Sequence, residues 1–122
     1  MTSTSDLLSL GMPAAQALAE GFSSIAITAA GTTTTDATVC DNQNDVFTMT
    51  ATGSDGIRIN TNWPLLQPVF VVNTSASTGK VYPATGGNFN GGTTDAALSI
   101  LTKKAALIMR ISTTSFLFIN SG

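Results

Sequence analysis

From Ser23 onward, apolar and polar residues alternate along the chain with a period of two. The alternation is clearest at residues 25–28, 46–51 and 57–59. Because successive side chains of a β-strand point to opposite faces, this period predicts strands with one buried face. Turn signals rich in Gly, Asn, Asp and Ser separate the apolar runs and indicate about eight strands at roughly ten-residue spacing. With no crossover helices between them, these strands predict an antiparallel β-sandwich, jelly roll or small barrel over residues 23–122.

Residues 1–22 follow a different pattern, which predicts a short helical arm ahead of the β domain. Asp6 suits the first turn of one helix, Pro13 suits the start of a second, and Gly21 suits its end. The apolar residues of the arm predict one shared face, which consists of Leu7, Leu10, Met12, Leu18 and Phe22. Helices this short are marginal alone, so we expect the arm to dock onto another surface.

Residues 96–109 leave two alternatives open. Their Ala, Leu and Lys residues tolerate a helix, but the short apolar runs on either side of residues 102–104 favour a hairpin of two strands. We therefore predict strands in this region.

The composition adds an argument about the surface. A chain of 122 residues is one domain by length and can bury a real core, and 43% of its residues are hydrophobic. Only 10% are charged, against about 25% in typical soluble domains. Ser and Thr cover part of the surface, and coverage of the rest by other protein would explain the low charge. We therefore expect an oligomer or a docked component of an assembly.

Several partners and locations are disfavoured by the charge and by the apolar runs. Five Lys and Arg residues and a net charge of −2 form no basic stripe, which predicts no nucleic-acid partner. No apolar run reaches the length of a membrane-spanning helix, and the first residues do not have the pattern of a secretory signal. A single cysteine, Cys40, cannot form an internal disulfide, which fits synthesis in a reducing cytoplasm.

The residues that could do chemistry predict no enzyme activity, no cofactor and no metal. Without histidine, the commonest general base is missing, and Cys40 has no neighbour in sequence that would activate its thiol. We interpret Cys40 as a half-buried residue at a strand end. The seven acids are expected at caps and turns. Asp41 and Asp45 lie close together, but their loop lacks the glycine and glutamate of an EF-hand and only weakly suggests calcium.

The segment NWPLLQP at residues 62–68 interrupts the strand pattern and leaves two interpretations open. Trp63 is either a buried plug of its own loop or an exposed anchor between subunits, since Trp is enriched at the centres of interfaces. We group Trp63, Leu65 and Leu66 with the apolar residues of the arm as a candidate interface.

Residues 81–118 contain a succession of short motifs. They are VYP (81–83), the turn GGNFNG (86–91), an Ala- and Ser-containing strand (96–100), KK (103–104) and FLF (116–118). The glycines of the turn predict positive backbone angles φ on both sides of an anchoring Phe89, because neither a P-loop nor a βαβ context is present. Together with LGMPA at residues 10–14, this succession resembles the capsid decoration (cement) and head-fibre proteins of tailed bacteriophages.

The resemblance implies a non-enzymatic protein on the virion surface that bridges subunits of the major capsid protein and stabilises the shell. It also implies self-association, with a trimer at local three-fold positions as the first expectation and a dimer at two-folds as the second. The alternative is a head-fibre or tail-tip module that binds a receptor or a carbohydrate, for which Trp63 beside Asn60 and Asn62 supplies a weak site. Copy number separates the two, because decoration proteins reach hundreds of copies per particle and fibres only tens or fewer.

Overall fold

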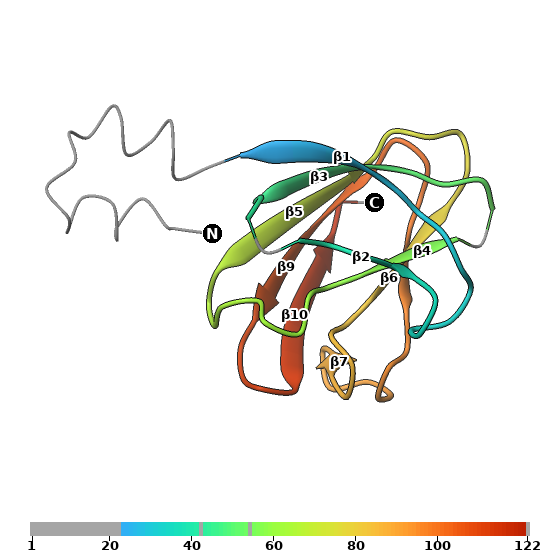
Figure 1. Cartoon of the computed structure of the whole chain (residues 1–122). Helices are drawn as coiled ribbons and strands as arrows, with labels where there is room; N and C mark the ends of the chain where they lie inside the picture. Colours follow the sequence, from blue (N-terminus) through green and yellow to red (C-terminus); the bar gives the residue numbers. More distant parts are fainter. Residues whose placement is uncertain (1–22, 42, 54, 122) are drawn as a thin grey trace, which may run out of the picture.

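The computed structural model describes residues 23–41, 43–53 and 55–121. These residues form ten β-strands and no helix (Figure 1). The predicted helical arm, residues 1–22, lies outside the described residues. The strands are β1 (Ser24–Thr28), β2 (Thr38–Val39), β3 (Val46–Thr50), β4 (Gly56–Arg58), β5 (Pro68–Asn73), β6 (Gly79–Tyr82), β7 (Asn88–Phe89), β8 (Leu98–Ile100), β9 (Ala105–Arg110) and β10 (Ser115–Asn120).

The strands form two sheets on opposite sides of one core. Sheet A has six strands in the order β1-β3-β5-β9-β10-β7, and sheet B has four strands in the order β2-β4-β6-β8. From β1 to β6 the chain alternates between the sheets, and strands of successive circuits pair in parallel. The result is a β-solenoid of about four turns.

The last circuit runs in the opposite direction. Strand β8 pairs antiparallel with β6 in sheet B, and β9 pairs antiparallel with β5 in sheet A. Strand β10 then forms a hairpin with β9, and the short β7 lies parallel to β10 at the edge of the sheet. The reversed circuit therefore pairs with the strand edges of β5 and β6 that the parallel coil would leave open.

The predicted antiparallel sandwich, jelly roll or small barrel is wrong. A period of two assigns side chains to one face or the other, but it does not specify the direction of the neighbouring strand. Parallel neighbours usually need a helical crossover, whereas here the crossover is a strand of the opposite sheet. The structure also has ten strands rather than about eight, and two of them, β2 and β7, are only two residues long.

Strands occupy the region for which a helix was the alternative, so the prediction of strands between residues 96 and 109 is confirmed. The predicted hairpin is wrong, because β8 and β9 lie in different sheets. Residues 101–104 carry the chain from one sheet to the other, with Lys103 in a left-handed conformation at φ 61°. The hairpin of this part of the chain is formed by β9 and β10 instead.

The core lies between the inner faces of the two sheets. Across sheet A, Phe47, Val71 and Ala106 lie side by side on neighbouring strands. Across sheet B, Ile57 lies beside Val81. All five side chains are buried in one continuous cluster. The alternation that predicted the inner faces of β3 and β4 is therefore confirmed.

A weak internal repeat underlies the coil. In sheet A, one circuit carries the chain from Ser24 to Val46 and the next from Val46 to Phe70, which are advances of 22 and 24 residues. In sheet B, the circuit from Gly56 to Lys80 also advances by 24 residues. Repeats of roughly 20–50 residues are the usual signature of solenoids. This spacing is the sequence signal that would have indicated the fold.

Candidate protein-binding surface

The outer face of sheet A carries rows of apolar side chains. The strand register places Val46, Phe70, Leu107 and Ile119 side by side on β3, β5, β9 and β10. We call the outward-pointing apolar residues of these four strands the apolar face, which consists of Val46, Pro68, Phe70, Val72, Ala105, Leu107, Met109, Leu117 and Ile119. The face therefore crosses the centre of the sheet and is not a scatter of single residues.

The apolar face contains no charged side chain, and the other outward positions of sheet A are Ser, Thr, Ala and Asn. Its tallest members remain accessible, with Phe70 39% and Ile119 52% exposed. A contiguous apolar surface of this kind is typical of a site that binds another protein.

The outer face of sheet B is different, because it is polar and partly covered. It carries Arg58, Lys80 and Tyr82, and residues 31–37 form a loop beside it. Arg58 Nη1 donates a hydrogen bond to the backbone oxygen of Thr34 at 2.8 Å, and the Tyr82 hydroxyl donates to the backbone oxygen of Thr32 at 2.7 Å. Sheet B is therefore closed by the chain itself.

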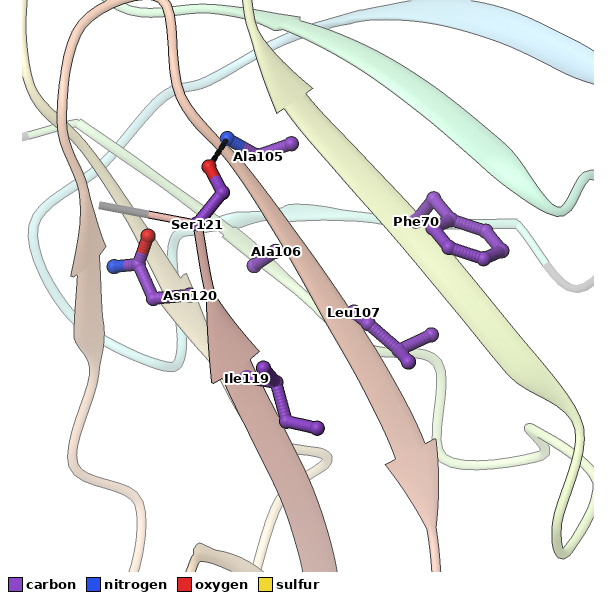
Figure 2. A pocket seen from close by; sticks show the side chains of 7 residues that line it. All are labelled: Phe70, Ala105, Ala106, Leu107, Ile119, Asn120 and Ser121. Carbon is purple, nitrogen blue, oxygen red and sulfur yellow. Dashed lines mark hydrogen bonds between the residues drawn. The ribbon is translucent and has the colours of Figure 1, made fainter.

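A shallow hollow of about 240 Å³ lies within the apolar face (Figure 2). Phe70 on β5 and Ile119 on β10 stand on either side of β9, where the side chains at 105 and 106 are only methyl groups. The end of the hollow is closed by the turn after β10, in which Ser121 Oγ accepts a hydrogen bond from the backbone nitrogen of Ala105 at 2.9 Å. The hollow is lined by Phe70, Ala105, Ala106, Leu107, Ile119, Asn120 and Ser121.

Strands β5, β9 and β10 are apolar at successive positions, with the sequences PVFVVN, AALIMR and SFLFIN. Such near-continuous runs are typical of strands that are covered on both faces. Their inner side chains, Val69, Ile108 and Phe116 among them, are buried in the core. The apolar face was missed from the sequence because alternation was the pattern sought, and these doubled runs are the signal that would have found it.

Leu66 and Ile111 extend the apolar face beyond the strand ends. The backbone nitrogen of Leu66 donates to the backbone oxygen of Arg110 at 2.7 Å, which continues the pairing of β5 with β9 by one more row. Leu66 is 64% exposed and Ile111 is 52% exposed. Leu65, at 58%, lies beside them, so two of the three predicted loop residues are on the surface.

Of the two interpretations of Trp63, the structure has the buried plug. The side chain is 2% exposed, and its Nε1 donates a hydrogen bond to the backbone oxygen of Gln67 at 2.8 Å. Its ring lies 6.5 Å from the ring of Phe47 in the core. Trp63 therefore supports the loop from beneath, and the exposed part of the candidate interface is Leu65 and Leu66.

Arg110 holds this loop against the turn between β9 and β10. Its Nη1 donates to the backbone oxygens of Thr61 at 2.8 Å and Trp63 at 2.9 Å. Its Nη2 donates to the backbone oxygen of Thr113 at 2.8 Å, and the guanidinium lies 5.5 Å from the centre of the Phe116 ring. These contacts give the two exposed leucines a defined position.

The remaining predicted interface residues cannot be placed on this surface. Leu7, Leu10, Met12, Leu18 and Phe22 lie outside the described residues. They stay a prediction of the sequence.

The residues considered for chemistry hold structural positions. Cys40 is fully buried rather than half-buried, and burial raises the pKa of its thiol to about 12, so it stays protonated at neutral pH. Asp41 accepts hydrogen bonds from the backbone nitrogens of Gln43 at 2.9 Å and Asn44 at 3.1 Å, which confirms its predicted role in a turn. Within the described ranges, no group of three His, Cys, Asp or Glu side chains could hold a metal ion.

The glycine-rich turn has the predicted form. Gly86 and Gly91 have positive φ of 86° and 75°. Between them Phe89 is buried, with its ring 6.1 Å from the ring of Phe116 and 5.1 Å from that of Phe118. The turn therefore serves to pack an aromatic side chain at the edge of sheet A.

Neither a protein-family model, nor a curated protein, nor a solved structure matches the chain. In the part of the chain that the structure describes, no helix is long and apolar enough to cross a membrane. Function is therefore inferred from the apolar face, the exposed loop and the sequence motifs.

Proposed function

We propose that this chain is a non-enzymatic structural protein that works by binding other protein chains. The observation that carries the proposal is that β5, β9 and β10 are apolar on both faces, whereas only their inner faces pack into the core. Covering the outer face with another protein removes apolar area from water, which is favourable, and the face has no charge whose desolvation would oppose it.

The particular role that we propose is decoration of the capsid shell of a tailed bacteriophage. It is supported by the motif resemblance in residues 81–118 and 10–14, by the charged fraction of 10%, and by the exposed leucines Leu65 and Leu66. Copies bound where capsid subunits meet would add contact area across several of them. An interface of about 1,000 Å² or more per copy would raise the free energy needed to separate the shell.

A receptor- or carbohydrate-binding role has less support. That alternative needed an exposed aromatic ring beside Asn60 and Asn62, and the ring of Trp63 is buried in the core. Asn60 Oδ1 instead accepts a hydrogen bond from the backbone nitrogen of Asn62 at 2.8 Å, within its own turn.

The proposal is tested on particles of the virus that encodes the chain, purified by density and compared on a stained gel. Decoration predicts a band for this chain at hundreds of copies, scaled to the band of the major capsid protein. Particles grown with Leu65→Asp should lose much of the band, whereas Thr85→Asp, at another exposed position, should not. Tens of copies, or none, would contradict decoration of the shell.

A further inference from the structure

We propose that a second copy of this chain covers the apolar face, so that two sheets A pack face to face about a two-fold axis near Leu107. This inference deepens the proposed function, because it takes the chain to be a protein-binding structural component and names the partner of one surface. It leaves the exposed loop at Leu65 for contact with the shell.

A second sheet is the layer that this face lacks. Sheets pack face to face at about 10 Å when both contribute apolar side chains. Sheet A already packs in this way on its inner side, and its outer rows at Phe70, Leu107 and Ile119 repeat the same apolar chemistry. A second sheet A would convert β5, β9 and β10 into strands covered on both faces, which their sequences indicate.

The apolar face is compatible with itself. Pairing a charged surface with a copy of itself places like charges together, and this face has no charge to oppose self-pairing. Its relief is also suited to self-pairing, since Phe70 and Ile119 project while Ala105 and Ala106 leave a hollow of about 240 Å³ between them. Projecting side chains of one copy can therefore enter the hollow of the other.

The size of the face meets the requirement of a specific dimer. Four strands at about 4.8 Å spacing and four rows at about 7 Å, counting the row of Leu66 and Ile111, give about 20 Å by 25 Å. This is about 500 Å² per copy and about 1,000 Å² for the pair, at the lower limit of specific interfaces.

The geometry favours a dimer over the trimer that was the first expectation. One flat face that binds its own copy forms a closed two-fold pair, because both partners use the same surface. A ring of three needs two different surfaces that fit each other. The apolar face is one continuous surface, so it favours the two-fold arrangement.

The test measures the mass of the purified full-length chain in solution, without particles, so its result is independent of shell binding. Sedimentation equilibrium should give twice the mass of the chain. Leu107→Glu should weaken the dimer at least about 100-fold, because the new carboxylate would be buried without a partner. Ser99→Glu is the matched control on β8 of sheet B, opposite Lys80, and should leave the dimer intact. A monomeric wild-type chain, or a Leu107→Glu dimer of unchanged affinity, would overturn the proposal.

A cysteine variant identifies what lies on the face. Cys40 is fully buried, so Leu107→Cys adds the reactive thiol, and Ser99→Cys is its control. A short bis-maleimide should link two Leu107→Cys chains and not two Ser99→Cys chains. A Leu107→Cys thiol that neither links nor reacts with a small maleimide in a monomer would show that residues 1–22 of the same chain cover the face. That result would also overturn the proposal.

Discussion

Asp45 and Asn73 are polar side chains with no exposed surface, and their surroundings satisfy them to different degrees. Asn73 Nδ2 donates to the backbone oxygens of Ser77 at 2.8 Å and Ile100 at 3.0 Å, and its Oδ1 accepts from Ser75. Asp45 Oδ1 accepts from Gln67 Nε2 at 3.1 Å, while Oδ2 has no hydrogen-bond partner among the described residues. Burial therefore raises the pKa of the Asp45 carboxyl despite that one hydrogen bond.

The raised pKa of Asp45 predicts a specific dependence of stability on pH. The folded state holds a proton that the unfolded chain releases near about pH 4, so the contribution of Asp45 is complete below that pH. It declines as the pH rises through the folded-state pKa. Asp45→Asn stays neutral and keeps an acceptor for Gln67, so it should melt above the wild type at about pH 7 but not at about pH 3. Thermal melts across this range check the prediction, and an equal difference at both ends would contradict it.

The burial of Trp63 predicts a large loss of stability when its side chain is removed. Trp63→Ala should lower the free energy of unfolding by about 3–5 kcal/mol, because it leaves a cavity beside Phe47 and removes the hydrogen bond to Gln67. Leu65→Ala in the same loop is the control and should change it by less than about 0.5 kcal/mol, since Leu65 is exposed. Urea denaturation at one fixed protein concentration measures both variants. Similar small effects would place Trp63 outside the core.

At the scale of elements, the strands of sheet A differ in what their outer faces carry. Strand β3 alternates apolar and Thr residues as VFTMT, whereas β9 and β10 are apolar at successive positions through most of their length. The alternating strand lies toward one edge of the sheet, and β9 lies in its middle. The apolar face is therefore widest where a second layer would be centred.

The turn between β6 and β7 depends on a glycine without a positive φ. A Cβ on Gly87 would lie 2.7 Å from Cε1 of Phe116 and 3.0 Å from the backbone oxygen of Ala84, both closer than carbon atoms approach without displacement. Gly87→Ala should therefore cost about 1–3 kcal/mol of stability, as overpacking typically does. Thr85→Ala, at an exposed position of the same turn, should cost little.

A double variant separates overpacking from a loss of backbone freedom at Gly87. Phe116→Leu removes the ring that the new methyl group would meet, so Gly87→Ala should cost less in that background than in the wild type. Chemical denaturation of the four proteins measures the coupling. Fully additive costs would contradict the predicted clash.

At the scale of the whole molecule, the parallel coil and its reversed last circuit explain where apolar surface remains. Sheet B is narrow, with four strands, and the loop at residues 31–37 closes its outer side. Sheet A gains β9 and β10 from the reversed circuit, so it is wider and its outer side stays open over those strands (Figure 1). The reversal that protects the open edges of the coil thus also creates the apolar face.

Local features of this protein could be predicted from the sequence alone. The strands with a buried inner face, the turn role of Asp41 and the glycine-rich turn around Phe89 all follow from interactions between residues close in the chain. Backbone sterics and side-chain alternation act over a few residues, so their outcome is contained in the local sequence. Several such features were correct even though the predicted architecture was not.

The tertiary structure alone decided which strands become neighbours, because pairing brings together residues that are distant in the chain. The parallel register of Ser24 with Val46 spans 22 residues, and the same strands could have paired antiparallel without changing which side chains face the core. The burial of Trp63 depends on Phe47 from another circuit, and the apolar face exists only after β3, β5, β9 and β10 are placed side by side. A surface built from separate circuits is therefore set by the packing of the whole chain.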